Sequence, residues 1–160
     1  MTIRPPARAL IAALLAIPAG ANTLMSQTRT THVLTLEAAR KATTAAEAEA
    51  RRQGWEMSIA IVDPSGTLLH FIRMDGAPAS SVDLSLGKAR TSARFRRPSK
   101  SLADAVAEGR AGLVGAEGML MMEGAVPVVV DGEVVAAIGV SGATGAQDAQ
   151  VAAAGAATVQ

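Results

Sequence analysis

The sequence predicts an α/β protein of the α+β type, with a five-stranded, largely antiparallel sheet between layers of helices. Two turn motifs carry this prediction. Asp63-Pro64-Ser65-Gly66 separates two apolar, strand-like runs, and Asp131-Gly132 separates two more. Strands joined by such short turns form hairpins and are therefore antiparallel. Helical stretches before, between and after the hairpins give the order α-β-β-α-α-β-β-β-α, which is typical of a three-layer α/β/α domain.

The first predicted helix begins near Thr35, a possible N-cap, and runs through an alanine-rich stretch to Gly54. Glycine is the residue that most often ends a helix, because it adopts the left-handed conformation without strain. The residues predicted to be buried repeat at helical spacing and are Leu36, Ala39, Ala42 and Ala46. Such a small-residue face suits close packing on a sheet.

The remaining elements follow from the same signals. Strands are predicted at 57–62 and 67–74, and a helix from Ser80 or Ser81 to just before Pro98, followed by a short second helix that ends near Gly109. Three short strands are predicted within 119–141, and a final helix at about 146–157. One domain over 33–157 accounts for all of them.

The N-terminal residues have the pattern of a signal peptide. Arg4 and Arg8 precede the apolar stretch "ALIAALLAIPAGA", and Ala19-Gly20-Ala21 fits a small-x-small cleavage site. We therefore expect residues 1–21 to be removed on export, leaving a periplasmic or secreted protein. The apolar stretch is too short for a stable membrane anchor. Met25 offers an alternative cytoplasmic start, which would make residues 1–24 an extension outside the protein.

The composition excludes some classes of function. Aromatic residues make up only 2% of the chain and the formal net charge is +1, so the sequence offers neither the stacking platforms nor the basic excess of a nucleic-acid-binding protein. The chain has no cysteine. Disulfides, thiolate metal sites and cysteine nucleophiles are therefore excluded.

A glycine-rich stretch near the C-terminus, "AIGVSGATGAQDAQ", resembles a nucleotide-binding loop at first inspection. Gly139, Gly142 and Gly145 are spaced by three residues, but only 15 residues follow Gly145, too few for the next strand of a dinucleotide-binding fold. The Lys-Ser/Thr pair of a phosphate loop is also missing. Two interpretations remain: a sharp strand-to-helix turn capped by Ser141 or Thr144, or a loop whose backbone N–H groups receive an anionic group.

Four segments together resemble one known family. "LTLEAA", "VDPSGTLLHFIRMDGA", "GKARTSA" and "VPVVVDGEVVAAIGVSGATGAQDAQVAAAG" are similar, in this order, to the GlcG/HbpS-like family of haem-binding and haem-degrading-type domains. The C-terminal domain of PduO-type cobalamin adenosyltransferases is related. The resemblance covers roughly residues 33–157 and implies a profilin-like fold, homo-oligomers such as dimers or octamers, and haem as a cofactor in some members.

The resemblance makes haem ligands worth seeking. Haem iron is usually held by His, Met, Cys or Tyr, and this chain lacks Cys and Tyr. His32, just before the first helix, is the candidate axial and metal ligand, although a free surface histidine at this place would need no special explanation. His70 lies in a strand among apolar neighbours, where packing is favoured over ligation. The methionines at 119, 121 and 122 are interpreted as flexible core residues.

Cations and the glycine loop supply candidate contacts for carboxylates. Lys88 stands at the position that matches the family motif, and Arg90, Arg94 and Arg97 are spaced to share one helix face. Such a basic run is usually a solvated helix face. Alternatively, Lys88 or Arg90 could pair with haem propionates or with a small organic acid, and the loop residues Gly139, Ser141 and Gly142 could assist. Asp148 matches the family's acid and is expected in the first turn of the last helix.

The sequence therefore supports one function best and leaves others open. The first is a homo-oligomeric haem or tetrapyrrole-binding protein, with slow haem breakdown as a consequence of exposed iron. The second is an enzyme or accessory factor that acts on a small organic carboxylate in a catabolic pathway. The third is a structural oligomer without a ligand. No sequence motif identifies a catalytic residue.

Overall fold

The elements of the computed structural model follow the predicted order except at one strand. The structure describes residues 30–159; the predicted signal peptide lies outside them and stays a prediction. The helices are α1 (Leu36–Gln53), α2 (Ser81–Phe95), α3 (Ser99–Ala107), the 3-10 helix η2 (Ala111–Gly115) and α4 (Gly145–Ala156). The strands are β1 (Ser58–Val62), β2 (Leu68–Arg73), β3 (Ala125–Val130) and β4 (Glu133–Ser141).

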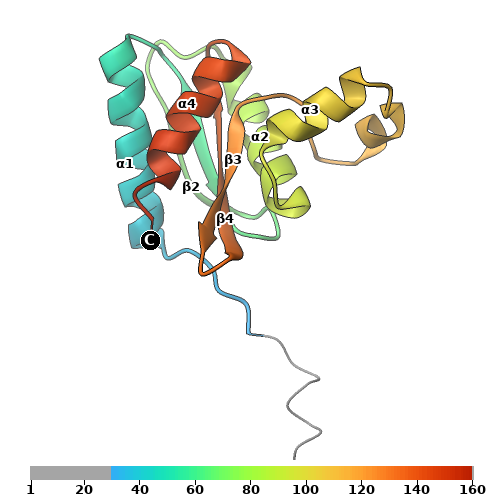
Figure 1. Ribbon diagram of the computed structural model, residues 1–160. Coiled ribbons are helices and arrows are strands. Elements are labelled where there is room, and N and C mark those ends of the chain that lie inside the picture. Colours follow the sequence, from blue (N-terminus) through green and yellow to red (C-terminus); the bar gives the residue numbers. More distant parts are fainter. Residues whose placement is uncertain (1–29, 160) are drawn as a thin grey trace, which may run out of the picture. The chain divides into compact units, whose positions relative to one another are not determined.

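The four strands form one antiparallel sheet in the order β2-β1-β4-β3. Helices α1 and α4 lie side by side on one face, and α2 covers the other, so the predicted three layers are present (Figure 1). Helix α3 and η2 extend from α2 beyond the edge at β3. Among residues 30–159, none of the helices combines the length and the apolar character needed to cross a membrane.

The two central strands explain the apolar runs in the sequence. Every residue of β1 is buried, as are all residues of β4 from Val135 onward, because helices cover both faces of the sheet. On the α1 side, Ala39, Ala42 and Ala46 are fully buried, as predicted. The prediction for Leu36 was wrong: it is 48% exposed, because it stands at the very start of the helix, outside the contact with the sheet.

The cap and stop of the first helix and the Asp131-Gly132 turn are confirmed, whereas Ser80 precedes α2 without a capping hydrogen bond from its side chain. Thr35 caps α1 through its side chain, and Gly54 ends the helix in the left-handed conformation. Asp131 and Gly132 have φ angles of 49° and 78°, so both central residues of the β3–β4 turn adopt the conformation that favours Asp-Gly in tight hairpins. Helix α2 ends at Phe95, earlier than Pro98 indicated.

The predicted fifth strand is absent from the described part of the chain. Residues 119–122 form an irregular segment, which makes the expectation of a five-stranded sheet wrong. The reason lies in α2: the Thr91 hydroxyl accepts a hydrogen bond from the Leu120 N–H at 2.7 Å and lies 3.0 Å from the Leu120 carbonyl. A side chain thus satisfies a backbone group that a neighbouring strand would otherwise pair.

Helix α2 lies unusually close to the sheet, and Gly139 in β4 makes this possible. A Cβ atom at this position would lie 2.2 Å from the Ser85 carbonyl oxygen and 2.5 Å from the Ala89 nitrogen, both backbone atoms of α2. Buried serines and alanines of α2, together with Thr91, complete the interface. Because α2 packs so closely on β4, a long side chain of α2 can contact residues beyond this strand.

We predict that Gly139→Ala destabilises the protein by about 1–3 kcal/mol, because a methyl group would push α2 away from β4. Gly112→Ala is the control: no atom lies within 4 Å of a Cβ there, and its cost should stay below about 0.5 kcal/mol. Urea denaturation of both variants measures the difference. Equal stabilities would show that α2 adjusts freely, against this interpretation.

Candidate functional site

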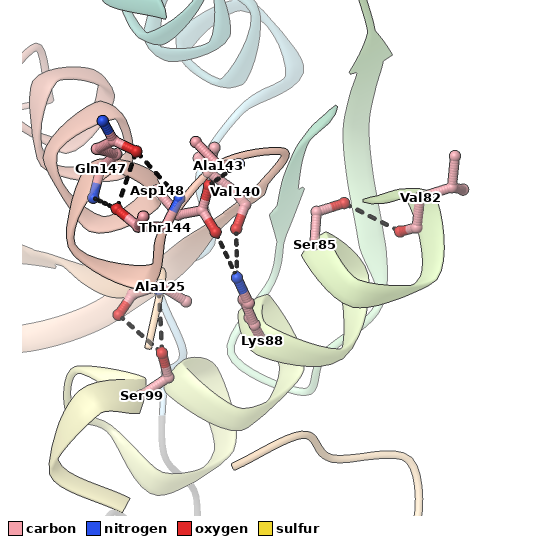
Figure 2. Close-up of polar contacts among 10 residues, drawn as sticks. All are labelled: Val82, Ser85, Lys88, Ser99, Ala125, Val140, Ala143, Thr144, Gln147 and Asp148. Atoms are coloured by element: carbon pink, nitrogen blue, oxygen red, sulfur yellow. Dashed lines mark hydrogen bonds and ion pairs between the residues drawn. The ribbon is translucent and has the colours of Figure 1, made fainter. Parts of the chain in front are cut away.

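A buried ion pair joins Lys88 and Asp148, the two polar residues that were expected to match the family motif. Lys88 projects from α2 toward the end of β4, and Asp148 projects from the first turn of α4 to meet it (Figure 2). The Lys88 Nζ atom lies 2.7 Å from Asp148 Oδ2, and each side chain is only 2% exposed. The expected position of Asp148 in the first helical turn is confirmed.

Backbone groups complete this ion pair. Lys88 Nζ also donates to the Val140 carbonyl at 3.1 Å, and the Ala143 N–H donates to Asp148 Oδ1 at 3.1 Å (Figure 2). The pair therefore holds α2, the end of β4 and the start of α4 together. Burial raises the pKa of Asp148 above its ordinary value, while Lys88 and the backbone N–H groups of Ala143 and Gly142 oppose that rise.

The glycine loop between β4 and α4 serves this arrangement. Thr144 and Gln147 form a capping box, with the Thr144 N–H donating to Gln147 Oε1 and the Gln147 N–H donating to Thr144 Oγ1. With the Ala143 N–H on Asp148, three N–H groups at this helix start have partners within the chain. Of the two interpretations of the loop, the capped strand-to-helix turn is present with Thr144 as the cap, and the carboxylate that the loop N–H groups receive is that of Asp148.

The other loop residues predicted to bind a ligand have packing roles. Gly139 contacts α2, and Ser141 is buried at the end of β4. A Cβ atom at Gly142 would lie 2.4 Å from the Glu56 carbonyl oxygen, so the backbone passes directly against the segment before β1. Lys88 likewise pairs with a carboxylate, but with that of Asp148 rather than that of a ligand. In the described residues, every buried side-chain nitrogen or oxygen has a hydrogen-bond partner.

His32 lies on the surface at the other end of β4. The next-but-one residue, Leu34, donates its N–H to the Val135 carbonyl at 3.2 Å, which fixes the segment before α1 along the strand. His32 Nδ1 is 3.3 Å from Glu133 Oε2, and the two side chains are 71% and 57% exposed. When Nδ1 carries the proton that Glu133 accepts, Nε2 keeps its lone pair and faces an accessible surface.

His70 is held between the sheet and α1. Its Nδ1 lies 3.0 Å from Thr43 Oγ1, and the Thr43 hydroxyl donates to the Ala39 carbonyl at 2.9 Å. Because that hydroxyl has only one proton, His70 must donate from Nδ1. The contact ties β2 to α1, in agreement with the expectation that packing is favoured at this position.

The basic run of α2 separates into different environments. Arg90 donates from Nε to the Gly66 carbonyl, and Arg94 donates from Nε to the Ser65 carbonyl. Arg97 was expected to share their helix face, and this prediction was wrong. Helix α2 ends at Phe95, and Arg96 adopts a left-handed conformation with φ of 55°. Within residues 30–159, no group of three or more His, Cys, Asp or Glu side chains could hold a metal ion.

Sequence reasoning missed two residues of these sites. Gly124 precedes β3, and a Cβ atom there would lie 2.7 Å from Lys88 Nζ and 2.9 Å from the Val140 carbonyl oxygen. Only a tertiary contact reveals that requirement. Arg94 was recognised as part of a helix face but not as a partner of the β1–β2 turn; its spacing of four residues from Arg90 was the available signal.

Comparison with known proteins decides the family. A family model described as "Haem degrading protein HbpS-like" matches residues 34–157. The chain belongs to the HbpS-like family. The predicted resemblance is thus confirmed.

Relatives of this HbpS-like domain agree with the match. Protein GlcG of Escherichia coli K12 is 44% identical over 113 residues, which cover 71% of this chain and 84% of GlcG. A double mutant of Streptomyces reticuli HbpS has 39% identity and a TM-score of 0.78, covering 97% of this chain and 99% of that one. A PduOC–haem complex shares the fold, with a TM-score of 0.74, 24% identity and coverage of 80% and 96%.

We predict that Gly124→Ala destabilises the protein more than Gly109→Ala does. Both glycines have positive φ, 130° and 105°, so both variants bear the cost of that conformation. Only at Gly124 would the methyl group also meet Lys88 and the Val140 carbonyl. The extra loss should be at least about 1 kcal/mol in urea denaturation. Equal losses would mean that the ion pair tolerates displacement.

Proposed function

We propose that this protein binds haem, with His32 as the side chain that ligates the iron. The observation that carries the proposal is the contact between His32 Nδ1 and Glu133 Oε2, at 3.3 Å. Histidines that bind metals usually donate their other ring N–H to a carboxylate or carbonyl, which fixes the tautomer and strengthens the ligating nitrogen. The donor set at His32 therefore fits haem iron, for which histidine is a common ligand.

Membership of the family supports the same ligand. The family is described by haem degradation, and a structure that shares its fold, PduOC, was solved as a haem complex. His70 is the second histidine of the chain, but its Nδ1 is engaged with Thr43 and its ring ties β2 to α1. His32 is exposed on a segment that no helix covers, so a planar ligand can approach it.

The proposal also includes slow degradation of the bound haem. Bound haem would supply iron that reacts with dioxygen when a reductant is present. The role of this chain would be to hold the iron through one exposed histidine, His32. No described side chain is assigned a catalytic step.

A homo-oligomer completes the proposal. Both edge strands of the sheet carry exposed apolar side chains, Leu68 in β2 at 46% and Val129 in β3 at 50%. Val33 and Leu36, on either side of the Thr35 cap, are each 48% exposed. Open strand edges and exposed apolar residues are favourable surfaces for association between copies of one chain. The segment that carries His32 would lie beside such a contact.

The alternative function, an enzyme that acts on small carboxylates, is not supported at its predicted site, because the predicted cation, Lys88, pairs with Asp148. That hypothesis assigned the carboxylate to Lys88 and the glycine loop, and both are engaged with Asp148. A carboxylate ligand would have to bind elsewhere on the molecule.

Hemin titration of the purified protein tests the proposal. We expect a saturable Soret band that shifts in His32→Ala, with affinity reduced at least tenfold, and a loss of about tenfold to a hundredfold in Glu133→Gln. His70→Ala is the matched control and should leave the Soret position unchanged. Loss of the Soret band under air with ascorbate reports degradation, and light scattering of the same samples gives the number of subunits.

Each part of the proposal fails separately. Without a saturable Soret band, the protein is not a haem binder. A band that is indifferent to His32→Ala removes the ligand assignment but not haem binding. A stable band under air with ascorbate rejects degradation, and a monomeric mass rejects the oligomer.

A further inference from the structure

Two arginines of α2 reach over the turn between β1 and β2. Arg90 and Arg94 are four residues apart and therefore neighbours on the helix surface. Arg90 Nε donates to the Gly66 carbonyl at 3.3 Å, and Arg94 Nε donates to the Ser65 carbonyl at 2.8 Å. Two guanidinium groups are thus anchored to consecutive carbonyls of one turn.

The turn itself is a rigid support. Asp63 Oδ1 accepts hydrogen bonds from the Ser65 N–H at 2.8 Å, the Ser65 hydroxyl at 2.6 Å and the Thr67 N–H at 2.9 Å. Burial opposes ionisation of Asp63, but these bonds prevail and lower its pKa below the ordinary value. The Asp63 carboxylate is therefore ionised and committed to the turn.

Gly66 brings the turn and the arginines into contact. This residue is buried beneath them, with φ of 91°. A Cβ atom here would lie 2.9 Å from Arg94 Nε and 3.2 Å from Arg90 Cγ. Any side chain at this position would displace the Arg94 guanidinium and crowd the aliphatic part of Arg90, so the placement of both side chains depends on the glycine.

Most of the hydrogen-bonding capacity of the two arginines remains available. A guanidinium has five N–H donors, and each of these groups uses only the one on Nε. Within residues 30–159, neither arginine lies within 4.0 Å of a carboxylate, and their terminal nitrogens have no hydrogen-bond acceptor. Other surface cations differ: Arg51, Arg52 and Lys100 each pair with an acid on their own helix.

The surroundings favour a small ligand over a protein carboxylate. Gly118 borders the guanidinium of Arg94, because a Cβ atom at this glycine would lie 4.0 Å from Nη1. The neighbouring acid, Glu117, is exposed and forms no ion pair with either arginine. Two guanidinium groups that are held in place through Nε and keep free N–H donors on their terminal nitrogens are suited to bidentate recognition of an oxyanion.

We propose that Arg90 and Arg94, supported by the Asp63–Gly66 turn, form a binding site for the carboxylate or phosphate group of a small anionic ligand. The site uses neither His32 nor the Lys88–Asp148 pair and does not depend on haem binding. It replaces the assignment of the carboxylate to Lys88 and retains the one to Arg90.

Titration calorimetry of the full protein with malonate and with inorganic phosphate, at constant ionic strength, tests this site. We expect saturable binding of at least one of the two anions, and comparison of the two identifies the preferred oxyanion. Arg90→Gln and Arg94→Gln should each weaken binding by about tenfold or more, because each removes charged hydrogen bonds. Arg40→Gln, which removes one exposed charge from α1, is the control and should change the affinity less than twofold.

Arg94→Lys separates recognition from support of the turn. Lysine keeps the charge but lacks the planar fork, so anion affinity should fall while the net charge stays the same. If neither anion binds saturably, or if Arg40→Gln weakens binding as much as the other variants, the site does not exist. A loss of stability in Arg90→Gln and Arg94→Gln with unchanged anion affinity would likewise overturn it, since the arginines would then only brace the turn.

Discussion

The ion pair between Lys88 and Asp148 is the constraint on which the rest of this structure depends. Removing two opposite charges from water is costly, and the attraction between them compensates only when the geometry is close and the remaining polar atoms have partners. Both conditions hold, with a separation of 2.7 Å and backbone groups of Val140 and Ala143 on either side. Glycine at positions 124 and 139 then follows as a requirement, because α2, β3 and β4 must approach one another closely enough for the pair to form.

The Lys88–Asp148 pair also shows that the glycine loop of the motif has a structural role in this chain. The glycine loop and its aspartate form the most distinctive part of the sequence, yet their polar groups are satisfied inside the molecule. The side chains with nitrogen atoms that remain available to a ligand lie elsewhere. They are His32 beside the β3–β4 hairpin, and Arg90 and Arg94 beside the β1–β2 turn. Because β1 and β4 are antiparallel with Val62 opposite Ala137, that turn and that hairpin lie at the same end of the sheet.

Local chemistry made most of the fold predictable. The Asp-Gly turn, the Thr35 and Thr144 caps and the terminal Gly54 depend on a few adjacent residues, and each was found as expected. The prediction of a fifth strand was wrong because the hydroxyl of Thr91, which is distant in sequence, accepts the hydrogen bond of the Leu120 N–H. The apolar character of residues 119–122 alone gives no sign of that contact.

The candidate sites were harder to predict, since they depend on distance across the fold. Lys88 was recognised as the polar residue of the motif, but its partner is 60 positions away in the same chain. Arg90 was recognised by charge, whereas its anchoring to Gly66 required the packing of α2 against a turn. Residue type indicated the class of chemistry, and tertiary structure determined whether the group is available to a ligand.

A double-mutant cycle at the central ion pair tests this account most directly. Lys88→Met and Asp148→Asn, singly and together, would be compared by urea denaturation. We expect each single variant to lose about 3–5 kcal/mol, because it leaves a buried polar group without its partner. The double variant should lose less than the sum, with a coupling of at least about 2 kcal/mol. Losses that add within about 0.5 kcal/mol would contradict the central role of the pair.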